Sequence, residues 1–112
     1  MLITVAETPE YIRLADKLLS PDERRDLISY LAAHPRAGDL IEGTGGVRKL
    51  RWARGGRGKS GGVRVIYYVH SEAMPLYLLT LFAKSERANL SKAERNDLAG
   101  LVDILVSRWL ED

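Results

Sequence analysis

The sequence predicts one α+β domain in which helices pack on one face of an antiparallel β-meander. Three observations lead to this class. Helix-start signals occur near both ends of the chain, three apolar and aromatic runs lie between them, and 112 residues with 46% hydrophobic content suit a single core. The expected order over residues 1–112 is one strand, two helices, three strands and a last helix (β-α-α-β-β-β-α).

The first third of the chain is expected to hold a strand and two helices. Residues 2–5 form a short apolar run that is typical of a strand. Thr8, followed by proline, predicts the start of a helix with apolar residues on one side. Ser20 and Glu23 form a capping box for a second helix. The glycine-rich residues 36–46 then predict a loop.

The remaining elements follow from local patterns as well. The runs 47–54, 63–70 and 76–84 are rich in β-branched, aromatic and aliphatic residues, so each predicts a strand. Short connections make an antiparallel meander the natural arrangement. Ser91 and Glu94 form another capping box, which predicts a C-terminal helix with one apolar side.

Positive charge is concentrated in the middle of the chain. The net charge is +2, but residues 43–89 hold nine Arg or Lys against two Asp or Glu. Such asymmetry favours a polyanionic partner for one face of the protein. A solvated basic loop is the simpler alternative.

Composition argues against several classes of protein. There is no cysteine and there are only two histidines, so neither a disulfide nor a metal site is expected. No run of 18 apolar residues occurs, and the first residues lack the regions of a signal peptide. We therefore expect a cytoplasmic protein with no metal, no cofactor and no membrane contact.

The stretch ARGGRGKSGG at residues 53–62 resembles the end of a phosphate-binding P-loop. A Walker A loop requires glycine where this chain has Ala53, and it leads into a helix. Here the last glycines lead into VRVIYYV, a strand pattern, so no helix N-terminus is available for a nucleotide. We expect a basic hairpin connection in which Arg57 and Lys59 hold a nucleic-acid backbone.

Strand alternation predicts a basic groove. Lys49 and Arg51 share one face, whereas Leu50 and Trp52 share the other, which we expect to be buried. In each of the next two runs, a basic residue at a strand end shares a face with aromatic residues. Provided that no bulge shifts the register, four cationic side chains converge near one open groove: Lys49, Arg51, Arg64 and Lys84.

Aromatic residues near this groove would suit single-stranded RNA. Basic side chains neutralise phosphates, and aromatic rings stack on bases. Tyr68 and Phe82 are the candidates for stacking. Packing in the core is the alternative for both rings.

Two long stretches of the chain resemble a known family. They read IEGTGGVRKLRWARGGRGKSGGVRVIYYV and LYLLTLFAKSERANLSKAE, and they belong to a region of similarity that spans about residues 38–102. Their ordered blocks are similar to the HigB/RelE superfamily of bacterial type II toxins. The closest similarity is to the HigB branch, with its G-T-G-G-x-R-K-x-R, G-K-x-G-G-x-R-x-I-Y-Y and K-x-E-x-x-x-L-S motifs.

The resemblance implies a RelE-like fold and a toxin that acts as an mRNA endoribonuclease, or mRNA interferase. Members of this superfamily commonly cut mRNA in the ribosomal A site and so inhibit translation. They are silenced by a cognate antitoxin encoded beside them. For this chain the resemblance implies mRNA and the ribosome as targets, a helix-turn-helix antitoxin, and contact with DNA only through the toxin–antitoxin complex.

The resemblance also implies site residues. Lys49 and Arg51 match the basic pair on the first meander strand of the family, and Arg64 matches the arginine of the following block. Lys84 falls at the basic position that closes the last strand. Some relatives carry an arginine and a tyrosine shortly after this lysine, where the present chain has Ser85 and Leu90.

RNA cleavage by attack of the 2′-hydroxyl gives these residues distinct roles. Arginine stays protonated and suits two phosphate oxygens, so Arg64 and Arg51 are expected to stabilise the transition state. Lys49, crowded by like charge that favours its neutral amine, is the candidate base. Lys84 is the candidate acid or a second phosphate contact.

Further basic and aromatic residues are expected to contact the RNA or the ribosome: Arg48, Arg54, Arg57, Lys59, Tyr68 and Phe82. Two alternatives to a nuclease remain open on these residues. One is a non-enzymatic module that binds RNA or the ribosome, and the other is a protein-interaction domain with an acidic ligand.

Overall fold

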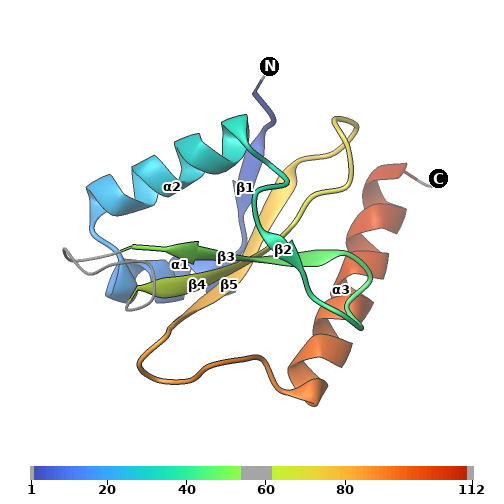
Figure 1. Ribbon diagram of the computed structural model, residues 1–112. Helices are drawn as coiled ribbons and strands as arrows, with labels where there is room; N and C mark the ends of the chain where they lie inside the picture. Colours follow the sequence, from blue (N-terminus) through green and yellow to red (C-terminus); the bar gives the residue numbers. More distant parts are fainter. Residues whose placement is uncertain (1, 54–61, 111–112) are drawn as a thin grey trace.

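The protein forms a five-stranded mixed sheet with three helices (Figure 1). The computed structural model describes residues 2–53 and 62–110. Along the chain, the elements are β1 (Val5–Glu7), α1 (Pro9–Leu18), α2 (Pro21–Ala33), β2 (Asp39–Leu40), β3 (Val47–Trp52), β4 (Val63–Tyr68), β5 (Leu76–Ala83) and α3 (Lys92–Leu110).

The expected meander forms the centre of the sheet. Strands β3, β4 and β5 pair antiparallel in chain order, and the full strand order is β1-β5-β4-β3-β2. The predicted α+β class is therefore confirmed. A bulge between Ile66 and Tyr67 shifts the register of β4 against β5. The three strands end slightly earlier than the sequence runs suggested.

The first strand lies later in the chain than predicted. It forms at Val5–Glu7, where it pairs in parallel with β5. Residues 3 and 4 form backbone hydrogen bonds with two separate parts of the chain. The Ile3 N–H donates to the Ala32 carbonyl at 3.0 Å, whereas the Thr4 carbonyl accepts from the Leu76 N–H at 2.9 Å. A local apolar run does not reveal which of its residues will meet a sheet edge.

Each helix begins where the capping residues predicted. The Thr8 hydroxyl accepts from the Tyr11 N–H at the start of α1. Ser20 and Glu23 form a reciprocal capping box at α2, and the Ser91 hydroxyl accepts from the Glu94 N–H at 3.1 Å before α3. These bonds satisfy donors that lack partners within the first helical turn.

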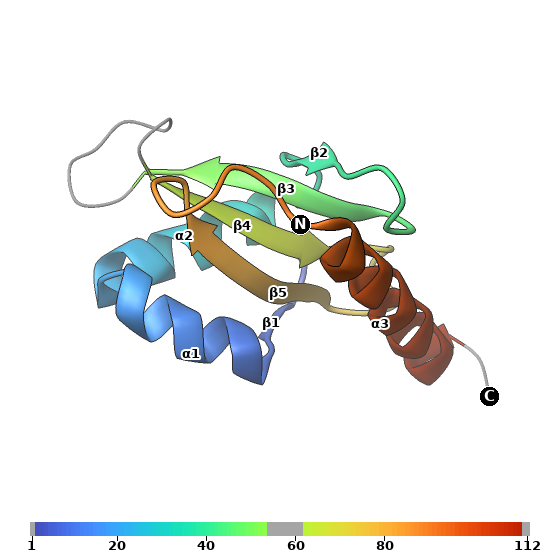
Figure 2. The same ribbon diagram turned by 90° about the horizontal axis from the view of Figure 1, so that it is seen from below.

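The two N-terminal helices cover one face of the sheet, as expected. Figure 2 shows α1 and α2 together on one side of the strands. Their buried residues join those of the sheet in one hydrophobic cluster, which includes Tyr11, Leu27, Val65 and Leu81. Leu50 and Trp52 are partly buried against the same cluster, on the side that their alternation predicted.

The third helix adds a second core on the opposite face. Val102 of α3 is buried with Ile66, Tyr68 and Phe82, whose side chains alternate with those of the first cluster. No helix in the described parts of the chain is long and apolar enough to cross a membrane. Helix α3 covers only part of this face of the sheet, and the site described below lies on the remaining part.

The predicted loop at residues 36–46 contains a short strand. Asp39 and Leu40 form β2, which pairs antiparallel with β3. The turn that joins them is built by Thr44, whose hydroxyl donates to the Ile41 carbonyl at 2.6 Å and accepts from the Val47 N–H at 3.1 Å. Gly43 and Gly45 have φ near +79° and +76°, which favours glycine.

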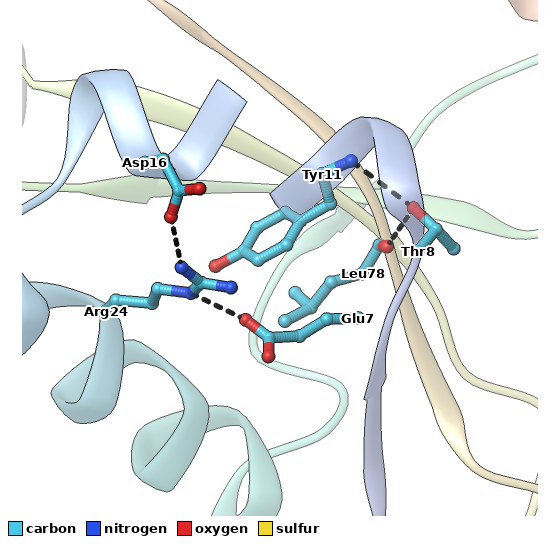
Figure 3. Close-up of polar contacts among 6 residues, drawn as sticks. All are labelled: Glu7, Thr8, Tyr11, Asp16, Arg24 and Leu78. Atoms are coloured by element: carbon cyan, nitrogen blue, oxygen red, sulfur yellow. Dashed lines mark hydrogen bonds and ion pairs between the residues drawn. The ribbon is translucent and has the colours of Figure 1, made fainter. Parts of the chain in front are cut away.

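An ion-pair network joins β1, α1 and α2. Figure 3 shows Arg24 between two carboxylates: its Nε lies 2.7 Å from Glu7 Oε2, and its Nη1 lies 2.6 Å from Asp16 Oδ1. The Thr8 hydroxyl extends the connection to the sheet by donating to the Leu78 carbonyl at 2.8 Å. Three elements are thereby held in one arrangement above the first core.

Candidate active site

A basic pocket lies on the face of the sheet opposite α1 and α2. Its volume is about 580 Å³. Strands β2, β3 and β4 contribute to it, together with the segment 84–90 between β5 and α3 (orange in Figure 1). The lining residues are Ala37, Asp39, Lys49, Leu50, Arg51, Arg64, Lys84, Ala88 and Asn89.

The four cationic residues singled out from the sequence all line this pocket. Arg51 and Arg64 are direct partners across β3 and β4, so their side chains leave the sheet on the same side. Lys49, two residues earlier on β3, lies on that side as well. Their convergence agrees with the strand alternation. Their catalytic roles stay predictions.

Lys84 reaches the pocket because the β4–β5 ladder continues past the end of β5. The Lys84 N–H donates to the Gly62 carbonyl at 3.0 Å, just after Val63 pairs with Ala83. This bond places Lys84 beside the beginning of β4, where Arg64 lies. The bulge farther along β4 does not disturb this end of the pairing.

Arg64 forms the buried part of the pocket. Only 6% of the residue is exposed, whereas Arg51 opposite it is exposed and Lys49 is half-buried. Burial, and then the charge of Arg51, lowers the pKa of the Arg64 guanidinium from its ordinary value. Two like charges directly opposite each other destabilise a sheet. Such an arrangement favours binding of an anion between them.

The segment 84–90 forms one wall of the pocket and is anchored at several points. Lys49 Nζ donates to Asn89 Oδ1 at 3.3 Å. The guanidinium of Arg87 lies 4.6 Å from the ring centroid of Phe82, and its Nη1 lies 2.6 Å from Glu94 Oε1. Because Leu90 is buried in the second core, the wall is tied to α3 as well as to the sheet.

The two aromatic candidates for base stacking are core residues. Tyr68 and Phe82 are each 5% exposed and pack in the second cluster with α3. Arg87 also covers the ring of Phe82. Alternation placed both rings on the correct face, but it does not reveal that α3 and Arg87 cover them. In this structure neither ring is open to an RNA base, so core packing replaces the stacking hypothesis.

Arg48 is engaged on the other side of β3. Its Nη1 donates to the Gly38 carbonyl at 2.7 Å and to the Arg36 carbonyl at 3.3 Å. It therefore holds the segment before β2 and is not among the pocket-lining residues. The other predicted backbone contacts, Arg54, Arg57 and Lys59, lie outside the described residues.

Two polar residues of the pocket, Asp39 and Asn89, were not predicted from the sequence. Asp39 belongs to β2, which was expected to be loop, and Asn89 belongs to the segment before α3. The capping box at Ser91 indicates only where α3 begins. Within residues 2–53 and 62–110, no group of three His, Asp or Glu side chains is placed to hold a metal ion.

The protein is thus a small α+β protein whose open sheet carries a cationic pocket on the face that α3 covers only in part, and such a pocket suits phosphate groups. Residues 31–109 match the family model described as the RelE toxin of the RelE/RelB toxin–antitoxin system, and the chain belongs to this family. It is therefore a toxin of a toxin–antitoxin system, with an antitoxin as its partner.

A solved structure shows the same fold. The chain is similar to a double arginine-to-alanine mutant of the E. coli toxin RelE in the free state, with a TM-score of 0.59 and 16% sequence identity. The match covers 91% of the present chain and 98% of the E. coli chain. The fold expected from the resemblance in the sequence is thus confirmed.

Proposed function

We propose that this toxin is an endoribonuclease of the HigB branch that cleaves mRNA on the ribosome and thereby inhibits translation. No metal or cofactor enters the proposed reaction. The observation that carries the proposal is the pair Arg51 and Arg64, directly opposite each other across β3 and β4 at a pocket of about 580 Å³. A phosphate between two guanidinium groups would relieve their repulsion and accept their hydrogen bonds.

The proposed reaction begins with attack of the ribose 2′-oxygen on the adjacent phosphorus. The 2′-O–H bond breaks and the 2′-O–P bond forms, while the P–O5′ bond breaks to leave a 2′,3′-cyclic phosphate and a 5′-hydroxyl. Arg64 and Arg51 stabilise the negative charge that develops on the phosphorane. Lys49 is the general base expected from the sequence, which takes the proton of the 2′-hydroxyl. Lys84 protonates the leaving 5′-oxygen or binds the phosphate.

The proposed activity also defines where and with what the protein acts. Cleavage of mRNA during translation requires the protein in the cytoplasm, in contact with ribosomes. The antitoxin is proposed to be a helix-turn-helix protein encoded beside the toxin. DNA would then be contacted only by the antitoxin within the complex. Outside the described residues, Arg54, Arg57 and Lys59 are proposed to hold the RNA or ribosomal backbone.

The test is a cleavage assay with purified toxin, ribosomes and mRNA. Arg64→Ala should lower the cleavage rate by about 10²–10³-fold, because one preorganised stabiliser of the transition state is lost. Arg13→Ala, which removes an exposed arginine of α1, is the matched control and should cleave at the wild-type rate. Circular dichroism would show that both variants fold.

The outcomes separate the proposal from its alternative. Cleavage at the wild-type rate by Arg64→Ala would overturn the role of this residue. If the wild-type protein binds ribosomes or RNA without cutting either, the chain is a non-enzymatic binding module. Omitting the ribosome from the assay tests ribosome dependence separately, because free mRNA should then remain uncut.

A further inference from the structure

We propose that Asp39 is the general base of the RNA cleavage, the group that removes the proton from the 2′-hydroxyl. The inference rests on the proposed nuclease function and deepens it. Asp39 is the one carboxylate among the described residues that line the basic pocket. The same pocket is lined by four cations that suit a phosphate, Lys49, Arg51, Arg64 and Lys84.

The pairing of β2 with β3 puts Asp39 on the pocket side of the sheet. Asp39 is the direct antiparallel partner of Lys49. Side chains of such partners leave the sheet on the same side, with β-carbons about 4.5–5.5 Å apart. Lys49 lies two residues before Arg51 on β3, so both side chains are on the same face of the sheet. On this face, the Asp39–Lys49 pair is therefore the neighbour of the Arg51–Arg64 pair.

A set of buried contacts fixes the backbone that carries Asp39. The Gly38 N–H donates to the Tyr67 hydroxyl at 2.8 Å, and Tyr67 is fully buried in the first core. The Gly38 carbonyl accepts from Arg48 at 2.7 Å. A β-carbon at Gly38 would lie 2.9 Å from the Lys49 carbonyl oxygen and 2.9 Å from the Tyr67 ring, so the close approach requires glycine.

The turn after β2 fixes the same strand from its other end. The Thr44 hydroxyl bonds both the Ile41 carbonyl and the Val47 N–H, and the Ile41 N–H donates to the Val47 carbonyl at 2.8 Å. Strand β2 has only two residues, but hydrogen bonds of the residues before and after it hold both of its ends. Catalytic groups require this kind of fixed placement, within a fraction of an ångström.

The chemistry of the pocket favours a carboxylate over an amine as proton acceptor. An ionised carboxylate accepts a proton as it stands, whereas a lysine ammonium must first lose one of its own. Asp39 would take the proton of the 2′-hydroxyl as the 2′-O–P bond forms. Lys84 would give a proton to the 5′-oxygen as the P–O5′ bond breaks. Lys49 then remains an ammonium that binds the phosphate.

The experiment compares Asp39→Asn with the wild-type toxin in single-turnover cleavage of mRNA on ribosomes. Loss of a general base should lower the rate by about 10²-fold or more. Binding to ribosomes should be unchanged or tighter, since a negative charge leaves a basic pocket. Asp26→Asn, at an exposed position of α2, should leave both quantities unchanged. Asp39→Glu should recover part of the rate.

Two further measurements separate a base from a residue that only positions Lys49. In a Lys49→Gln background, Asp39→Asn should still lower the rate, whereas a positioning role would make the second substitution neutral. An RNA with sulfur in place of the 5′-oxygen releases its leaving group without protonation. It should restore cleavage by Lys84→Ala and fail to restore cleavage by Asp39→Asn.

The results distinguish failure of the inference from failure of the proposed function. If Arg64→Ala loses cleavage while Asp39→Asn cleaves at the wild-type rate, the nuclease proposal stands and the role of Asp39 is overturned. If Asp39→Asn is neutral only in the Lys49→Gln background, Asp39 is a positioning residue. If the wild-type protein cuts no RNA, both proposals fail together.

Discussion

Tyr11 shows at the scale of one residue that this core keeps a polar group without a partner. The residue is fully buried in the first cluster, and its hydroxyl has no hydrogen-bond partner among the described residues. Burial, reinforced by the charge of Glu7 and opposed by Arg24, raises the pKa of Tyr11 to about 12. The folded state therefore holds the neutral phenol more firmly than the unfolded chain does.

Tyr11→Phe should consequently stabilise the protein increasingly as the pH rises. The folded pKa of about 12 lies above the ordinary value of 10.0, so stability is intact below pH 10 and is lost between pH 10 and 12. The full loss from this group is on the order of 2–3 kcal/mol, because each pKa unit is worth about 1.4 kcal/mol. Phenylalanine has no such titration.

Urea denaturation of both proteins at pH 8 and pH 10.5 measures this effect. At pH 8 the variant should be as stable as the wild type or more so, since it buries no unpaired hydroxyl. The difference should grow at pH 10.5 in favour of phenylalanine. A constant difference across this range would mean that the Tyr11 hydroxyl titrates at the same pH in the folded and unfolded states.

At the scale of the elements, local signals predicted most of the fold. Each of these signals is formed by residues that lie close together in the chain. Examples are the capping boxes at Ser20 and Ser91 and the runs that became β3, β4 and β5. Alternation within these runs also placed Lys49, Arg51 and Arg64 on one face. These features depend on neighbours in the sequence, which is why the sequence reveals them.

The features that were not predicted from the sequence depend on contacts between distant parts of the chain. Strand β2 has two exposed residues and no periodic pattern, so only its pairing with β3 identifies it. Asp39 enters the pocket through that pairing. Burial of Tyr68 and Phe82 likewise depends on α3, which the alternation of the strands does not position. A stacking role for these rings was therefore a reasonable prediction that tertiary packing overturned.

Arg24 allows a test of how strongly β1, α1 and α2 depend on one another. Its side chain is 23% exposed and bonds Glu7 of β1 and Asp16 of α1. Arg24→Ala should lower the free energy of unfolding by about 1.5–3 kcal/mol, the range for hydrogen bonds to charged groups. Arg25→Ala removes a more exposed ion pair with Asp22 and should change stability by less than about 1 kcal/mol.

Chemical denaturation of the two neighbouring variants makes the comparison direct, because both remove the same side chain from the same helix. Equal effects would mean that the ion pairs of Arg24 contribute no more than a solvated surface pair. A larger effect of Arg24→Ala would show that the network holds the three elements together and not merely α2.

At the scale of the whole molecule, positive charge gathers at one place on the sheet. The pocket gathers Lys49, Arg51, Arg64 and Lys84 on the face opposite α1 and α2. On the side of α1 and α2, Glu7 and Asp16 are paired with Arg24. One side of the protein is thereby prepared for a polyanion, although the net charge is only +2.

This cluster of positive charge predicts how salt affects binding of single-stranded RNA. Each phosphate that the protein neutralises releases counterions, so affinity decreases as salt increases. On single strands, each such contact adds about −0.7 to the slope of log affinity against log salt concentration. Arg51 is exposed at the rim of the pocket, so Arg51→Gln should weaken binding and make the slope shallower by roughly this amount. Arg13→Gln on α1 carries the same charge change away from the pocket and should leave the slope unaltered. Titration of a labelled oligonucleotide between 50 and 300 mM salt, on the order of the range in which such slopes are measured, would reveal the difference. Equal slopes for both variants would show that RNA responds to the total charge of the protein and not to the pocket.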